Sequence, residues 1–439
     1  MKYKNIIPFA LAPADTGYRN QILGAFHALA ELTGNIWNDE DLFILPDNST
    51  SFQDVRNALY ASKFKSYNEF KKQVFILLDK YFEKQSFVPR IFITTYNATE
   101  SNKAGENADM LCHAIKAYYI AHKLGRVMTV VLTSKYYKYR YVDLINIPKH
   151  LMTFSLRIRL IQNQSLRKKV LTTIGIIHSF NRDKIDNQYK ILEELLSQFK
   201  DDEELKDIVK KFETYKRKSK KAVFCLGGRV EGSEIIFDIN YIQKLYSDAE
   251  KLVRNGYGVI FVNGPRTPNN VADYLYEKTK TNPNIIFQNC KRLAQTAEDR
   301  VPSQWRIYSG PNEENFKKMQ KLGNVYPAVL AFDNTIVVHT MDSYASCETA
   351  NVAIPTAISG KGLFIDPIIR YDCLNLALLL CPKYALDFDE FMNMACNMKI
   401  EPKDLHPRVL SSPLRVFAET AIKRLKQIEK TRNSSESRD

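Results

Sequence analysis

Long apolar runs and glycine are both scarce in this sequence. No stretch approaches the roughly 20 apolar residues that a membrane-spanning helix requires. The apolar run within MKYKNIIPFALAPAD is short and lacks a signal-peptide cleavage pattern, so it is better interpreted as a first strand. We therefore expect a cytoplasmic protein. Glycine contributes only 16 of the 439 residues, so glycines that cluster in a loop carry more information than usual.

Cysteine and histidine are also sparse, with seven of each, and they are scattered singly along the chain. Cys112, Cys225, Cys347 and Cys381 lie in apolar surroundings and are typical of reduced, buried thiols. Neither residue type shows the spacing of zinc ligands. The sequence therefore predicts no structural zinc, and we expect neither a metal nor a bound cofactor.

The composition is that of an ordinary globular protein, with 45% hydrophobic and 26% charged residues. A chain of 439 residues is long enough for two domains, each with its own core. The formal net charge of +14 favours contact with phosphates in nucleotides, nucleic acid or anionic lipid headgroups. A general abundance of lysine would explain the same surplus, so charge alone does not select a partner.

Short runs of β-branched and aromatic residues alternate with helical patterns along the chain. In the first half, helices are expected at 20–32 and 108–124, and strands at 4–11, 90–95, 127–133, 141–147, 152–154 and 170–176. In the second half, helices are expected at 242–255, 270–279, 328–332 and 344–352, and strands at 222–226, 258–262, 285–287, 335–339, 355–358 and 362–365. This alternation predicts two parallel sheets, each covered by helices on both faces.

A highly charged helical segment, 186–221, separates the two α/β patterns. We therefore expect an N-terminal domain at 1–218 that includes this linker, a C-terminal domain at 219–410, and a basic amphipathic helix with a frayed tail at 411–439. Two Rossmann-like α/β domains facing a central cleft are found in GT-B glycosyltransferases, periplasmic binding proteins and two-domain dehydrogenases. The sequence motifs are needed to decide among these three classes of protein.

The clearest motif follows the strand expected at 335–339. Asp342 or Ser343 can cap the next helix, whose unpaired N–H groups and dipole favour a phosphate. Glu348 lies one turn further on, where a carboxylate can accept hydrogen bonds from both hydroxyls of a ribose. A plain helix cap and a surface glutamate would explain the same residues.

Two further loops follow strands in this half. Gly227 and Gly228 come directly after one strand, where glycine permits close approach of a ligand. Arg266, with Thr267 and Pro268, follows another and could contact a diphosphate through its planar guanidinium. Each loop alone is equally consistent with an ordinary turn. Because all of them fall at the carboxyl ends of strands in one domain, their convergence favours nucleotide binding.

In the first half, Asp15 follows the first strand and begins the segment that leads into a helix. Its carboxylate is a candidate general base for an acceptor hydroxyl, and His150 is a weaker candidate. A turn in which the aspartate caps the helix entry is the alternative interpretation of Asp15.

These motifs, in this order, resemble the plant mitochondrial-fission "elongated mitochondria" family and its bacterial relatives, a branch of GT-B glycosyltransferase-like proteins. The resemblance covers about residues 5–370 and rests on Asp15, Gly17, Asn20, Gln21, Tyr141–Leu144, Pro148, His150, Val170–Gly175, Gly227, Gly228, Arg266–Pro268, Asn324–Tyr326, Asp342, Ser343, Ser346 and Glu348. It implies a metal-independent glycosyltransferase that binds a nucleotide-sugar. The donor-binding residues would be Gly227, Gly228, Arg229, Arg266, Thr267, Asp342, Ser343, Ser346 and Glu348, with Asp15 or His150 as base.

The acceptor stays open between a membrane glycolipid and a surface glycan. Basic, aromatic residues at 135–140 and a basic cluster at 157–169 could rest on anionic headgroups, which would place the protein peripherally at the cytoplasmic membrane face. A non-catalytic adaptor that recruits a membrane-remodelling or other protein partner is the alternative function. Nucleic acid is disfavoured as a partner, because the basic residues are spread widely and form no known binding motif.

Overall fold

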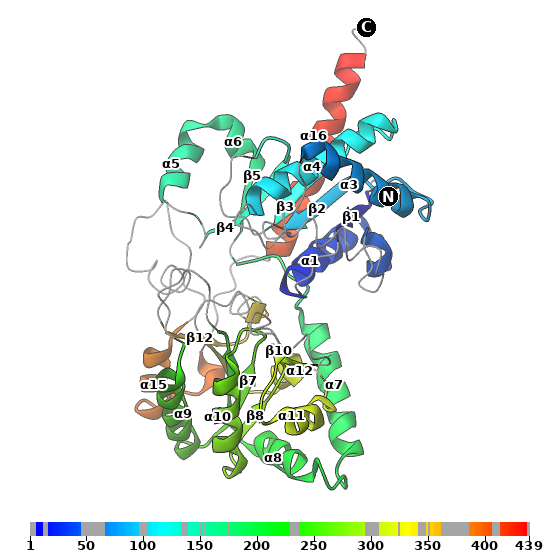
Figure 1. Ribbon diagram of the computed structural model, residues 1–439. Helices are drawn as coiled ribbons and strands as arrows, with labels where there is room; N and C mark the ends of the chain where they lie inside the picture. The colour runs from blue at the N-terminus through cyan, green and yellow to red at the C-terminus, as the bar shows by residue number, and fades with distance from the viewer. Residues whose placement is uncertain are drawn as a thin grey trace. The chain divides into compact units, whose positions relative to one another are not determined.

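The structure of the chain is a computed structural model that divides into two compact units. Unit 1 comprises Met1–Ser179 and Leu410–Asp439, and unit 2 comprises Phe180–Val409 (Figure 1). The described residues are 6–11, 16–44, 66–95, 104–132, 139–149, 152, 154–173, 175–228, 237–294, 307–323, 325–340, 348–349, 352–360, 386–405 and 413–436.

Unit 1 contains a five-stranded parallel sheet whose strands follow one another in chain order. The strands are β1 (Pro8–Ala10), β2 (Ile91–Thr95), β3 (Met128–Leu132), β4 (Leu144–Pro148) and β5 (Val170–Thr173). Every residue of the first four strands is buried, so both faces of this part of the sheet are covered. Near-continuous apolar strands of this kind are expected in parallel sheets.

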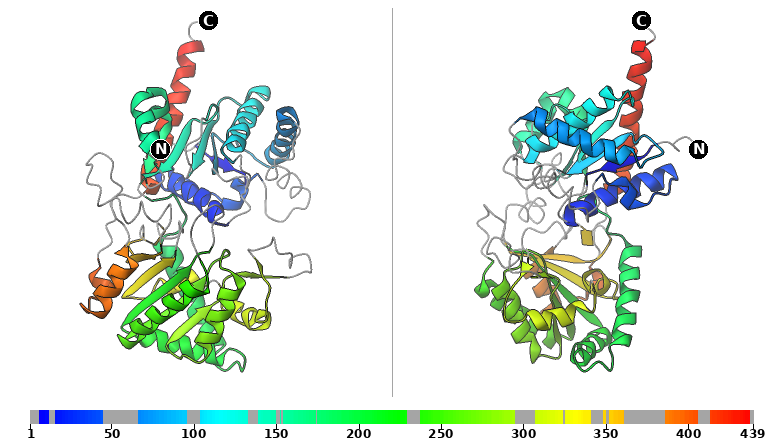
Figure 2. Two further views of the ribbon diagram at one scale, coloured as in Figure 1. Left: turned by 60° about the vertical axis from the view of Figure 1, so that its left-hand side comes forward. Right: turned by 45° about the vertical axis from the view of Figure 1, so that its right-hand side comes forward.

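Two pairs of helices cover that sheet. The helices of unit 1 are α1 (Thr16–Thr33), η1 (Asp39–Leu42), α3 (Tyr67–Phe82), α4 (Ala104–Ala121), α5 (Phe154–Gln162), α6 (Gln164–Lys169) and α16 (Pro413–Glu436). Helices α3 and α4 lie on the face of Phe9, whose ring stacks on Tyr81 at 5.8 Å and lies 6.2 Å from Tyr119. Helices α1 and α16 pack together and contact the sheet, so they cover its other face (Figure 2).

Unit 2 is built on a six-stranded parallel sheet. Its strand order is β13 (Leu386–Asp387), β12 (Thr356–Ser359), β11 (Thr335–Thr340), β6 (Lys220–Leu226), β7 (Tyr257–Asn263) and β8 (Ile285–Gln288). The chain starts at the central β6, moves outward through β7 to β8, and then returns to the other side of β6 at β11. This is the strand order of doubly wound dinucleotide-binding proteins, whose ligands bind where the order reverses. Here that switch point lies between β6 and β11.

The helices of unit 2 are α7 (Arg182–Gln198), α8 (Lys206–Arg217), α9 (Ile239–Arg254), α10 (Asn269–Lys280), α11 (Glu313–Gln320), α12 (Val325–Val329), α15 (Phe388–Cys396) and η4 (Pro402–Asp404). A small parallel pair, β9 (Arg292–Leu293) and β10 (Ile307–Tyr308), lies apart from the main sheet. Helices α7 and α8 contribute Ile185 and Phe212 to a core shared with Val223 of β6. They are therefore integral parts of unit 2.

The prediction of an α/β chain with two Rossmann-like units is confirmed. The units divide at Ser179 rather than at residue 218, because α7 and α8 pack in unit 2, and the last helix belongs to unit 1. The strand expected at 152–154 is wrong at Phe154, which begins α5. Among the residues that the structure describes, no helix has the length and apolar character that crossing a bilayer requires.

Candidate functional site

The ends of β6 and β11 are joined directly at the switch point. The backbone N–H of Gly227, just after β6, donates to the Thr340 hydroxyl at 2.7 Å. A Cβ added to Gly227 would lie 2.8 Å from the Thr340 carbonyl oxygen, closer than real Cβ atoms approach. A side chain at position 227 would therefore force the two strand ends apart.

Gly228 brings the loop after β7 into the same place. A Cβ at this position would lie 1.8 Å from the carbonyl oxygen of Arg266, so backbone packs on backbone and only glycine fits. Gly227 and Gly228 thus bring the ends of three adjacent strands together: β7, β6 and β11. The expected convergence of the glycine pair with the Arg266 loop is present in the structure.

Thr267 holds this arrangement from inside the fold. Its hydroxyl donates to the Gly227 carbonyl at 2.8 Å and accepts from the Gly264 N–H at 3.0 Å. The residue is fully buried. Thr267, which the sequence placed among ligand contacts, is therefore suited to position the loops rather than to touch a ligand.

Lys291 lies beneath the same loop, and sequence reasoning missed it. The side chain is only 1% exposed, and its ammonium donates to the Thr267 carbonyl at 2.9 Å and to the Asn269 Oδ1 at 2.8 Å. Burial lowers the pKa of Lys291 to about 8. In the described part of the chain no carboxylate pairs with it. A buried cation therefore lies at the start of α10, whose N-cap Pro268 supplies no side-chain hydrogen bond.

Of the expected motif residues Asp342, Ser343, Ser346 and Glu348, the structure describes only Glu348. Its burial raises the pKa of its carboxyl to about 7, against a smaller opposing effect of Lys184. Burial also raises the pKa of the Cys225 thiol in β6 and of the Tyr326 hydroxyl in α12, and the Glu348 charge adds to both shifts. The Glu348 carboxyl therefore lies close to the switch-point strand.

The neighbour of Glu348 is anchored to β11. The hydroxyl of Thr349 lies 3.1 Å from Nε2 of His339 and 3.0 Å from the Thr356 hydroxyl. His339 is completely buried, and burial lowers its pKa to about 3, so its ring is neutral. These contacts tie the segment that carries Glu348 to β11 and β12, on the β11 side of the switch point.

Six of the expected site residues lie outside the described residues: Asp15, His150, Arg229, Asp342, Ser343 and Ser346. Their assignments stay predictions. Within the described part of the chain, no group of three or more His, Cys, Asp or Glu side chains is placed to hold a metal ion.

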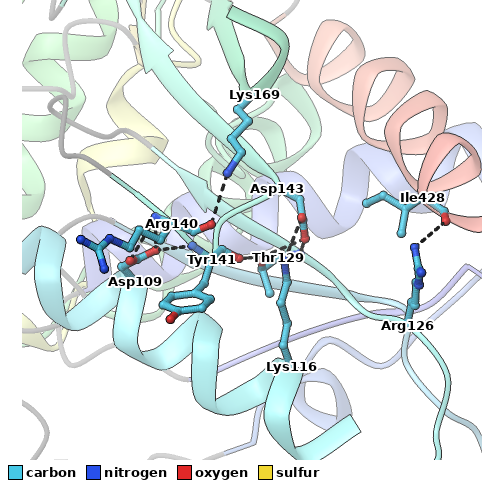
Figure 3. A network of polar contacts seen from close by, with 9 residues as sticks. All are labelled: Asp109, Lys116, Arg126, Thr129, Arg140, Tyr141, Asp143, Lys169 and Ile428. Carbon is cyan, nitrogen blue, oxygen red and sulfur yellow. Dashed lines mark hydrogen bonds and ion pairs between the residues drawn. The ribbon is translucent and has the colours of Figure 1, made fainter. Parts of the chain in front are cut away.

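Asp109 and Asp143 of unit 1 form a separate polar network (Figure 3). Asp143 accepts from Lys116 Nζ at 2.8 Å and from the Thr129 N–H at 2.9 Å, and Asp109 accepts from the Tyr141 N–H at 2.9 Å. Asp143 directly precedes β4 and Thr129 is near the start of β3, so the network lies at the amino edge of the sheet. It fixes the entry into β4.

No family model matches this sequence, and no curated relative matches it. Among solved structures, the chain is similar to an alpha,alpha-trehalose 6-phosphate synthase from Burkholderia multivorans. The two share 10% identity and a TM-score of 0.39, over 97% of this chain and 95% of that chain.

Proposed function

We propose that unit 2 binds the diphosphate of a nucleotide-sugar at the switch point between β6 and β11, and that the chain is a glycosyltransferase. The observation that carries the proposal is the packing of Gly228 on Arg266 beside the Gly227–Thr340 hydrogen bond. It brings the ends of three adjacent strands together at the carboxyl edge of a doubly wound sheet, where ligands of such sheets bind.

Positive charge at this edge supports a phosphate ligand. Arg266 offers a planar fork that matches phosphate oxygens. The first N–H groups of α10 lack a side-chain cap, and the Lys291 ammonium lies beneath them. An anion at this helix start would offset both the buried charge and the helix dipole.

The Glu348 carboxylate is the proposed ribose acceptor. With a pKa raised to about 7 by burial, it exchanges its proton near neutral pH. Ribose hydroxyls that donate to it would favour the ionised form. Arg229, Asp342, Ser343 and Ser346 would complete the donor site, and Asp15 or His150 would deprotonate the acceptor, a glycolipid or glycan. We propose no metal in this reaction.

The test is a thermal-shift and calorimetric screen of nucleoside diphosphates and nucleotide-sugars, followed by a sugar-transfer assay with the nucleotide that binds. Arg266→Ala should lower affinity about tenfold or more, because a charge-assisted contact to phosphate is lost. Glu348→Ala should lower the affinity for nucleotides that carry ribose. Arg254→Ala, an exposed arginine at the end of α9, serves as the matched control and should bind like the parent.

Failure of every nucleotide to raise the unfolding temperature would refute the proposal and favour the adaptor function. Equal losses of affinity in Arg254→Ala and Arg266→Ala would refute the placement of the diphosphate.

A further inference from the structure

Helices α5 and α6 of unit 1 belong to a segment with charge of one sign. No Asp or Glu occurs between Asp143 and Asp183 in the sequence. The two helices pack against each other and connect β4 to β5, the strand at one edge of the sheet (Figure 1, Figure 2). Basic residues in this segment are Lys149, Arg157, Arg159, Arg167, Lys168, Lys169 and Arg182.

Helix α5 has an inward and an outward apolar face. Leu156 is 1% exposed and Leu160 is partly buried, whereas Ile158 is 38% and Ile161 is 76% exposed. At 3.6 residues per turn, Ile158 and Ile161 project on the side of the helix opposite Leu156 and Leu160. The inward leucines hold α5 in place, and the two isoleucines face solvent together.

Arginines flank this apolar strip. Arg157 lies beside it on one edge and the exposed Arg159 on the other, and Arg167 and Lys168 are exposed in the last turn of α6. Lys169 differs, because its ammonium donates to a backbone carbonyl at 3.3 Å and burial lowers its pKa. We define the α5–α6 surface as Arg157, Ile158, Arg159, Ile161, Arg167 and Lys168.

We propose that the α5–α6 surface docks the protein on a membrane that contains anionic lipids. Cations beside an exposed apolar strip are complementary to a bilayer surface, where headgroups attract the cations and the isoleucines enter the acyl boundary. A nucleic acid would use the same cations but would gain little from the isoleucines. Ile158 and Ile161 therefore favour the membrane, and the docking does not depend on nucleotide binding.

The experiment is co-sedimentation of the full chain with vesicles of phosphatidylcholine, with and without phosphatidylserine. The protein should bind the phosphatidylserine vesicles, and added salt should weaken this binding. Arg167→Gln/Lys168→Gln should reduce the partition coefficient by about fivefold for each charge, or roughly 25-fold together. Ile161→Ser, which leaves the charge unchanged, should reduce it about tenfold.

Two matched variants in unit 1 serve as controls. Ile120 in α4 is also 76% exposed, so Ile120→Ser makes the same chemical change at a different surface. Lys72→Gln/Lys84→Gln removes two exposed charges elsewhere. Both controls should bind vesicles like the parent. The proposal is overturned if the protein does not bind anionic vesicles, or if the control variants lose as much vesicle binding as the α5–α6 variants. It is also overturned if Ile161→Ser binds normally, which would indicate a general polyanion surface.

Discussion

Glu348 couples the stability of unit 2 to pH. Burial raises its pKa from an ordinary 4.5 to about 7, so the folded state holds the proton more tightly than the unfolded chain. The free energy of unfolding should therefore fall by at most about 3 kcal/mol as pH rises from about 4.5 to about 7. Above pH 7 it should level off. Glu348→Gln should lack this decline. Denaturant unfolding of both proteins at pH 5 and pH 8 measures it, and parallel pH profiles would contradict the assignment.

For Lys291 we predict the opposite pH dependence of the unfolding free energy, at high pH. Burial lowers its pKa from 10.5 to about 8, so the unfolded chain binds the proton more tightly. The free energy of unfolding should rise from about pH 8 to pH 10.5, by at most about 3 kcal/mol, relative to Lys291→Met. Denaturant unfolding across that range compares the two proteins. A constant difference between them would show that the lysine titrates normally in the fold.

Residue chemistry also explains which site residues the sequence could predict. Gly227 and Gly228 stand directly after one predicted strand and Arg266 lies in the loop after another, and parallel strands bring their carboxyl ends to one edge. Lys291 stands after a strand too, but lysine at a strand end is ordinarily solvated. Its burial depends on Thr267 and Asn269, which are 24 and 22 residues away, so only tertiary packing reveals it.

At the level of elements, the close contact between the β6 and β7 loops should determine nucleotide affinity. Gly228→Ala would drive a Cβ against the Arg266 carbonyl, so the loops must separate. We expect a loss of about 1–3 kcal/mol in unfolding free energy and weaker nucleotide binding. Chemical denaturation and titration calorimetry measure the two effects.

Gly24→Ala is the matched control for that experiment. A Cβ there would lie 2.1 Å from the His178 carbonyl carbon, in unit 1. It should lower stability similarly and leave nucleotide affinity unchanged. A nucleotide affinity that falls equally in both variants would indicate general destabilisation rather than damage to the site.

Most strands could be predicted because their apolar runs are short and bounded. The strand predicted at 258–262 is β7, and the one at 335–339 is β11, each extended by a residue or two. Around Phe154 the sequence predicts a strand, because apolar and polar residues alternate there with the strand period. Leu156 and Leu160 instead share one face of α5. Burial of this helix face in unit 1 favours the helix over the strand. A short stretch of sequence does not show which face will be buried.

At the level of the whole molecule, the division between the units can be tested with fragments. Residues 180–409 should fold cooperatively alone, whereas 219–410 should not, because it lacks Ile185, Leu192 and Phe212 from the core. Circular dichroism and thermal unfolding distinguish these outcomes. A stable fragment 219–410 would restore the boundary expected from the sequence. The charge pattern predicts that boundary, but the fully buried residues of α7 and α8 are apolar or aromatic and belong to the core of unit 2.

Unit 1 should depend on its distant helix. Residues 1–179 lack α16, which buries Phe417, Ala421 and Leu425 and contacts β4 and β5. We expect this fragment to expose apolar surface and bind a hydrophobic dye, and a peptide of residues 410–439 to suppress that binding. Dye binding that the peptide does not change would show that α16 is dispensable.

Unit 1 is built from two separate stretches of the chain, and this has a consequence for biosynthesis. The ribosome makes α16 only after every residue of unit 2, and elongation at about 5–20 residues per second delays it by tens of seconds after residue 179. Unit 2 can therefore complete its core during translation, while the first-made sheet waits with β4 and β5 uncovered. A chaperone that acts on the nascent chain would find its binding surface there.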